Sequence, residues 1–245
     1  MSPTNGPQVE GIAVTMPDES FGRRLDRWSG GCLVAAGVLL LPNTAHPDVF
    51  DTDFARAALQ TRLWVPIHAS LVVSMIMSLV GLLGLYARRG HLLGRLGAVG
   101  FGLAVVGMVI GACAVYWEAF LLPPVARADP QLFAWGGPMV TSWGVLSGAL
   151  GGLWIVGLGV LGIALWRARA VPRGAALTLA VSALAFALFA GPFVPVLDVL
   201  ATVAFSVGYV WVGAALWRGA TGQTERDAGP GAPPAPNAEV PAARG

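Results

Sequence analysis

The stretch that decides the fold is residues 64–86, WVPIHASLVVSMIMSLVGLLGLY, which contains no Asp, Glu, Lys or Arg. A helix rises about 1.5 Å per residue and the hydrocarbon core of a bilayer is about 30 Å thick, so roughly 20 apolar residues are needed to cross it. This stretch meets that length, and Arg88 and Arg89 follow directly after it. It predicts a transmembrane helix.

Further apolar stretches repeat this pattern along the chain. They cover residues 28–41, 96–122, 140–166, 175–193 and 196–217. Of the 245 residues, 56% are hydrophobic and 11% are charged, whereas about a quarter of the residues of a soluble domain are charged. The composition excludes an ordinary soluble domain. We therefore expect an all-α integral membrane bundle of six transmembrane helices.

Arginines set the expected orientation, because positively charged residues of short loops are retained on the cytoplasmic side. They precede the first stretch, separate the second from the third and the fourth from the fifth, and follow the sixth. These arginines are Arg23, Arg24, Arg27, Arg88, Arg89, Arg95, Arg167, Arg169, Arg173 and Arg218. The opposite loops hold Arg56, Arg62 and Arg127. We predict that both termini are cytoplasmic and that the bilayer is a bacterial plasma membrane.

The two ends of the chain differ from the apolar part. Residues 1–20 and 219–245 are rich in Pro, Gly and Ala, and burial of so few large apolar groups does not offset chain entropy. We expect disordered tails on either side of a six-helix domain over residues 21–218. Residues 21–25, FGRRL, loosely resemble a twin-arginine export signal, but the acidic Asp26 and the later spans favour a retained first helix.

Three ionisable side chains are the candidates for chemistry, because a charged group in hydrocarbon costs roughly 2.5 to 3.5 kcal/mol. Glu118, Asp198 and His68 each lie about one turn inside the predicted outer end of their span. Helical periodicity places Glu118 on a stripe of small residues with Gly100, Gly107, Gly111 and Ala114. Asp198 shares a polar face with Thr202, Ser206 and Tyr209. Ser70, Ser74 and Ser78 form a small-residue packing stripe on another side of the helix from His68.

These positions suggest a pocket that opens toward the outer leaflet and binds a lipophilic small molecule. Two carboxylates in a medium of low dielectric constant can divide the roles of acid and base, so we assign these roles to Glu118 and Asp198, with His68 orienting one of them. The expected reaction is a cofactor-free proton transfer, such as a cyclisation or isomerisation. The predicted ligand-binding residues are Trp117, Trp143, Tyr116, Thr202 and Tyr209.

Several alternatives stay open. The same three side chains can hold a divalent cation, although no local spacing motif supports this. They can couple a proton or cation to transport, or they can lie near headgroup water in an accessory protein without chemistry. The loop with His46, Asp48, Asp51 and Asp53 is better explained as solvated and acidic than as a cation site.

Motifs for other chemistry are missing from the sequence. There is no phosphate-binding loop, paired-cysteine motif, nucleophile elbow or zinc-protease motif, so we expect neither a metal nor another cofactor. The net charge of +2 suggests no nucleic acid. A small, Trp-rich multispan chain with two intramembrane acids is similar to integral-membrane terpene cyclases, in which acids trigger carbocation cyclisation; no motif is matched residue by residue. Gly144, Gly148 and Gly152 predict a tight packing face, within the bundle or between the subunits of a homodimer.

Overall fold

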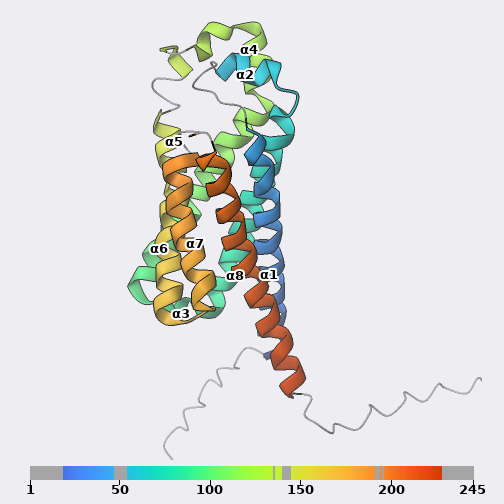
Figure 1. Ribbon diagram of the computed structural model, residues 1–245, viewed down its shortest axis with the longest axis vertical. Helices are drawn as coiled ribbons and strands as arrows, with labels where there is room; N and C mark the ends of the chain where they lie inside the picture. Colours follow the sequence, from blue (N-terminus) through green and yellow to red (C-terminus); the bar gives the residue numbers. More distant parts are fainter. Residues whose placement is uncertain are drawn as a thin grey trace, which may run out of the picture.

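The computed structural model describes residues 19–46, 54–134, 136–139, 145–190, 194 and 196–227. All regular structure in these residues is helical, and the helices gather into one elongated bundle (Figure 1). Five helices are long and apolar enough to cross a membrane. The predicted all-α class is therefore confirmed, and the helices are consistent with a membrane protein.

The long elements are α1 (Glu19–Leu40), α3 (Trp64–Phe120), α6 (Leu153–Ala168), α7 (Arg173–Ala185) and α8 (Leu197–Asp227). The short ones are η1 (Leu41–Ala45), α2 (Phe54–Gln60), α4 (Leu122–Ala128), η2 (Pro130–Phe133), α5 (Val145–Gly151) and the π-helical η4 (Phe186–Ala190). Helix α8 continues through residues 219–227, which the composition assigns to a disordered tail.

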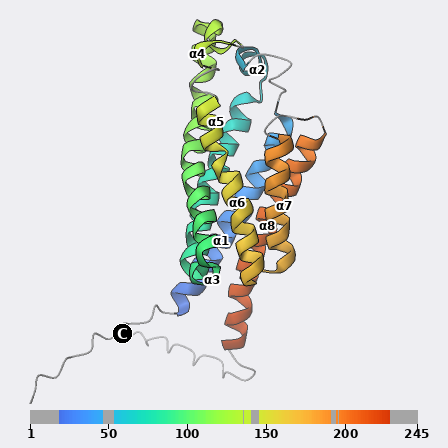
Figure 2. The same cartoon turned by 90° about the vertical axis from the view of Figure 1, so that its left-hand side faces the viewer.

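Helix α3 folds back on itself. A straight helix of its 57 residues would be about 85 Å long, yet the indole nitrogen of Trp64 donates to the backbone carbonyl of Glu118 at 2.8 Å. The reversal is at Gly94, whose φ of 58° and ψ of −160° suit a residue without a Cβ. We call residues 64–93 the first leg and residues 95–120 the second leg; both run along the bundle (Figures 1 and 2).

The helices surround a shared core. Helix α1 packs between the first part of α3 and α8, while α6 packs on α3 and α7 lies between α6 and α8. In the interior, the ring of Trp154 on α6 packs against Phe205 on α8 at a centroid distance of 5.4 Å. Phe186 packs against both rings. Trp154, near the middle of its predicted span, is thus a core residue.

Close approach of backbones holds the second leg of α3 against α6. A Cβ at Gly107 would lie 2.1 Å from the backbone nitrogen of Trp154, and one at Gly157 would lie 2.2 Å from that of Ala104. Only glycine allows the two backbones to come this close. In a membrane, where the hydrophobic effect does not drive helices together, this close approach adds van der Waals contact between them. The predicted small-residue stripe on this leg is therefore a helix-packing face.

The bundle has two distinct ends. The short helices α2 and α4 lie over one end, which we call the capped end (Figures 1 and 2). The opposite end, which we call the arginine end, has the start of α1, the turn at Gly94 and the connection from α6 to α7. The arginines of the predicted cytoplasmic loops all lie at this end. Their clustering agrees with the alternation of arginine-rich loops in the sequence.

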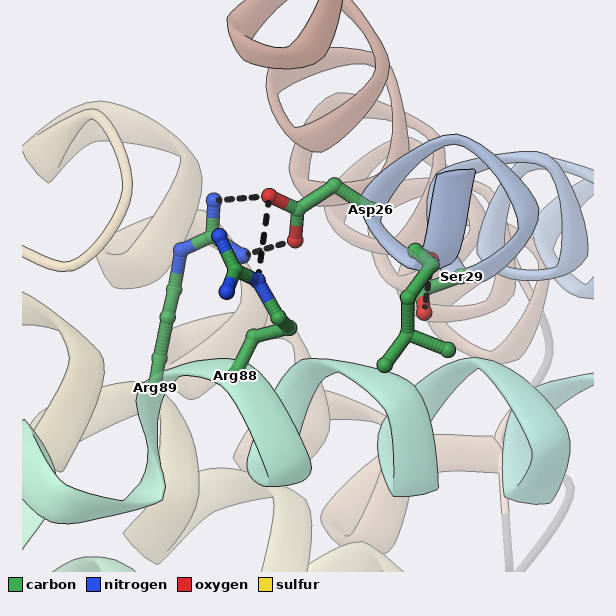
Figure 3. A network of polar contacts seen from close by, with 5 residues as sticks. Asp26, Ser29, Arg88 and Arg89 are labelled. Carbon is green, nitrogen blue, oxygen red and sulfur yellow. Dashed lines mark hydrogen bonds and ion pairs between the residues drawn. The ribbon is translucent and has the colours of Figure 1, made fainter. Parts of the chain in front are cut away.

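An ion-pair network fixes α1 to α3 at the arginine end (Figure 3). The two nitrogens Nη1 and Nη2 of Arg89 donate to the two carboxylate oxygens of Asp26, at 2.6 and 3.3 Å. The Nε of Arg88 lies 3.8 Å from the same carboxylate. Asp26 is only 3% exposed. The acidic residue at the start of the first span therefore pairs with both arginines that follow the second span.

Candidate functional site

A histidine and a glutamate meet at the capped end. His68 lies on the second turn of α3, and Glu118 lies near the end of the same helix after the reversal. The Nε2 of His68 is 3.5 Å from a carboxylate oxygen of Glu118. His68 is 3% exposed, while the Glu118 side chain is 34% exposed. The fold of α3 thus brings together two of the predicted site residues.

The hydrogen bonds of His68 determine which ring nitrogen can exchange a proton. Its Nδ1 lies 2.8 Å from the backbone carbonyl of Trp64. A carbonyl oxygen only accepts hydrogen bonds, so Nδ1 carries a hydrogen and donates it. In the neutral ring, Nε2 is then the nitrogen with the free electron pair. The nitrogen that faces Glu118 is therefore the one able to take up a proton.

A second histidine completes the site. The Nε2 of His46, just after η1, lies 3.3 Å from the Nε2 of His68. His46 and Glu118 thus approach the same nitrogen of His68, His46 at hydrogen-bonding distance and Glu118 at ion-pair distance. This nitrogen has one lone pair or one hydrogen, so it can exchange a proton with one of the two neighbours at a time. We call His46, His68 and Glu118 the relay.

Trp64 fixes the relay in place. Its ring stacks on His68 with a centroid distance of 4.2 Å and lies 5.4 Å from the ring of His46. Trp64 is buried in a small hydrophobic cluster with Leu122 and Phe133, which belong to the elements over the capped end. This cover limits the number of side-chain conformations open to the relay, which is what positioned acid–base groups require.

Asp198, the third predicted member, lies on another element. It is in the first turn of α8 and is half-buried, whereas the contacts to His68 come from α3 and the end of η1. Thr202 and Tyr209 follow it on α8 and are buried in the bundle. The Tyr209 hydroxyl accepts a hydrogen bond from Ser78 at 2.7 Å. This contact ties α8 to the first leg of α3.

The predicted aromatic residues occupy different surroundings. Trp117 is half-buried and packs against Phe133 below the cap, at a centroid distance of 5.6 Å. Tyr116 is exposed on the outside of the bundle and contacts Phe120. Trp143 lies outside the described residues, as do Asp48, Asp51 and Asp53 of the predicted acidic loop. Trp117 is thus the aromatic candidate next to the relay's cover.

The serine stripe on the first leg has a structural role. Ser74 donates to the backbone carbonyl of Ala36 at 2.7 Å, and Ser70 donates to that of Leu39. These bonds hold α1 in antiparallel register with the first leg. That register places the end of α1, and His46 after it, beside His68.

The two described glycines of the predicted packing face, Gly148 and Gly152, are not covered by another helix of this chain. A Cβ at Gly148 would meet no atom within 4 Å, and one at Gly152 would contact only carbonyl oxygens of the preceding helical turn. Gly144 lies outside the described residues. The described part of this face therefore remains uncovered within one chain.

The described residues do not include a group of three or more His, Cys, Asp and Glu side chains arranged to hold a metal ion. In the relay, His46 and Glu118 both approach one nitrogen of His68, whereas the ligands of a metal ion surround a common central position. Its geometry fits proton transfer. Comparison with protein-family models, with curated proteins and with solved structures finds no match to this chain.

Proposed function

We propose that the chain is a multi-pass protein whose relay exchanges protons with a lipophilic small molecule that enters from the outer leaflet. The single observation that carries this proposal is the buried Nε2 of His68, which faces both Glu118 and His46. An enzyme of this type would catalyse a cofactor-free cyclisation or isomerisation. In this proposal His68 and Glu118 are the acid–base residues, and Asp198 is a candidate second carboxylate.

The partial exposure of Glu118 supports contact with a ligand. His68 is almost completely buried, whereas a third of the Glu118 side chain is accessible. A reacting molecule could therefore reach the carboxylate, while the histidine behind it supplies or removes the proton. Trp117, on the neighbouring position of the helix, offers an apolar and aromatic surface. Aromatic faces stabilise cationic intermediates, so we propose Trp117 as a ligand contact.

The topology belongs to the same proposal. Because α3 has two legs, we propose a topology of six passes, in which the start of α1 and the described end of α8 lie at the arginine end. The positive-inside rule then assigns the arginine end to the cytoplasm and the relay to the outer side of a bacterial plasma membrane. The uncovered Gly148 and Gly152 support a homodimer contact.

A test uses the full chain in lipid nanodiscs prepared in heavy water, with a panel of isoprenoid alcohols and enones. Mass spectrometry measures deuterium incorporation and isomerised products. We expect Glu118→Gln to lower the rate by about 100-fold or more, the usual contribution of general acid–base catalysis. The matched control is Asp129→Asn, which changes an acid at the same end whose carboxylate caps the nitrogen of Gln131 on the surface.

The proposal fails if both variants insert and exchange deuterium at the rate of the unsubstituted chain.

A second candidate function, proton-coupled transport, is favoured by the hydroxyls of Thr202 and Ser206. Both are buried, and neither has a hydrogen-bond partner among the described residues. These groups extend the polar face of α8 toward the Ser78–Tyr209 pair. Proton uptake into vesicles that depends on Glu118, without any product, would support transport over catalysis.

A further inference from the structure

A groove of about 510 Å³ runs along the outside of α1 near the arginine end. Its floor is formed by residues of α1 at helical spacing, and one residue each from the first leg of α3 and from α8 lines its sides. The lining residues used below are Arg24, Arg27, Trp28, Cys32, Met77 and Trp217. This groove is at the end of the bundle opposite to the relay.

Two cations stand at one end of the groove. Arg24 and Arg27 are exposed, and among the described residues neither forms an ion pair. Arg88 and Arg89 at the same end differ, because both pair with the carboxylate of Asp26. Within the part of the chain that the structure describes, the groove therefore has two guanidinium groups without a carboxylate partner, which suits an anion.

The rest of the groove is apolar, and the groove as a whole is about as long as one leaflet is deep. From Arg24 to Ala35, the last lining residue on α1, the helix rises about 16 Å, close to the roughly 15 Å depth of one leaflet. Trp28 and Trp217 are 74% and 48% exposed. The Trp217 ring lies against the backbone of Gly31, where an added Cβ would be 3.0 Å from it.

We propose that this groove binds one acidic phospholipid. The phosphate lies between Arg24 and Arg27, since guanidinium groups donate paired hydrogen bonds to phosphate oxygens. One acyl chain follows α1 past Cys32 toward Met77, with the two tryptophan rings at its sides. Basic pockets between membrane helices bind anionic headgroups in this way. A soluble phosphate would use only the charged end and leave the apolar part empty.

Cys32 provides the test, because a bound acyl chain covers its thiol. The full chain is placed in phosphatidylcholine nanodiscs, with or without phosphatidylglycerol of the same acyl chains, and alkylated with a small maleimide. We expect phosphatidylglycerol to slow alkylation of the half-buried Cys32 by about tenfold, the effect of charge-assisted hydrogen bonds. The exposed Cys113, far from the groove on the second leg, is the internal reference and keeps its rate.

Substitution then separates the site from general lipid contact. The double variant Arg24→Gln, Arg27→Gln should lose the protection, whereas the control Arg167→Gln, Arg173→Gln removes the same charge at the same end and should keep it. The proposal is overturned if both lipids protect Cys32 equally, if the first variant is protected as well as the control, or if inorganic phosphate in pure phosphatidylcholine protects it. Comparing the two lipids on the unsubstituted chain requires no variant to fold.

Discussion

Replacing Gly107 by alanine is expected to lower the free energy of unfolding by about 3 kcal/mol, at the upper end of the cost of overpacking. The added Cβ would lie 2.1 Å from the backbone nitrogen of Trp154. Backbone atoms cannot rotate away as a side chain can, so the second leg of α3 and α6 must move apart. The midpoint of unfolding in detergent micelles, followed by circular dichroism, measures the effect.

Gly102→Ala is the matched control on the same leg. A Cβ at Gly102 would meet no atom within 4 Å. Because alanine favours helix more than glycine does, this variant should be unchanged or more stable by up to about 1 kcal/mol. Equal loss of stability in the two variants would contradict the assigned packing of α3 on α6.

Replacing Asp26 by alanine is expected to destabilise the bundle by about 2 to 3 kcal/mol. Removing one partner of a fully buried ion pair costs about 3 to 5 kcal/mol, and this value is discounted because the Arg89 and Arg88 side chains are 20% and 40% exposed. Both arginines would lose the carboxylate with which they pair. Chemical unfolding of the full chain in micelles measures the difference.

The control for this variant is Glu19→Ala. Glu19 pairs with Arg23 at 3.8 Å and its side chain is 89% exposed, so the loss should stay below about 1 kcal/mol. If Asp26→Ala were as stable as Glu19→Ala, the network in Figure 3 would not hold α1 to α3.

Hydropathy predicts the helices of this chain because the bilayer imposes a minimum length of apolar sequence. The stretch at residues 64–86 and all but the last two residues of the stretch at 96–122 lie in α3, on either side of Gly94. Periodicity also predicts the stripe with Gly100 and Gly107 as a packing face, and the contacts with α6 confirm it. The partner helix could not be predicted, because a stripe of small residues does not specify which helix covers it.

The candidate site could be predicted only in part. His68 and Glu118 share one depth and do meet, but the sequence assigns His46 to a solvated acidic loop, and the structure places it against His68. The sequence did contain a signal for this contact. Two consecutive spans run antiparallel, so the residues that follow the first span lie beside the residues that begin the second span. The same reasoning applies to Asp26 and Arg89 at the other end. The depth of Asp198 in the predicted span does not determine toward which neighbouring helix its side chain points.

The most direct test of the relay is the ¹⁵N NMR spectrum of the imidazoles in the full chain, which has three histidines. His46→Gln and His91→Gln variants assign the signals. The account predicts that Nδ1 of His68 carries a hydrogen, and that Glu118→Gln shifts the signal of its Nε2 while Asp129→Asn does not. A hydrogen fixed on Nε2, or an Nε2 signal unaffected by Glu118→Gln, would contradict the relay.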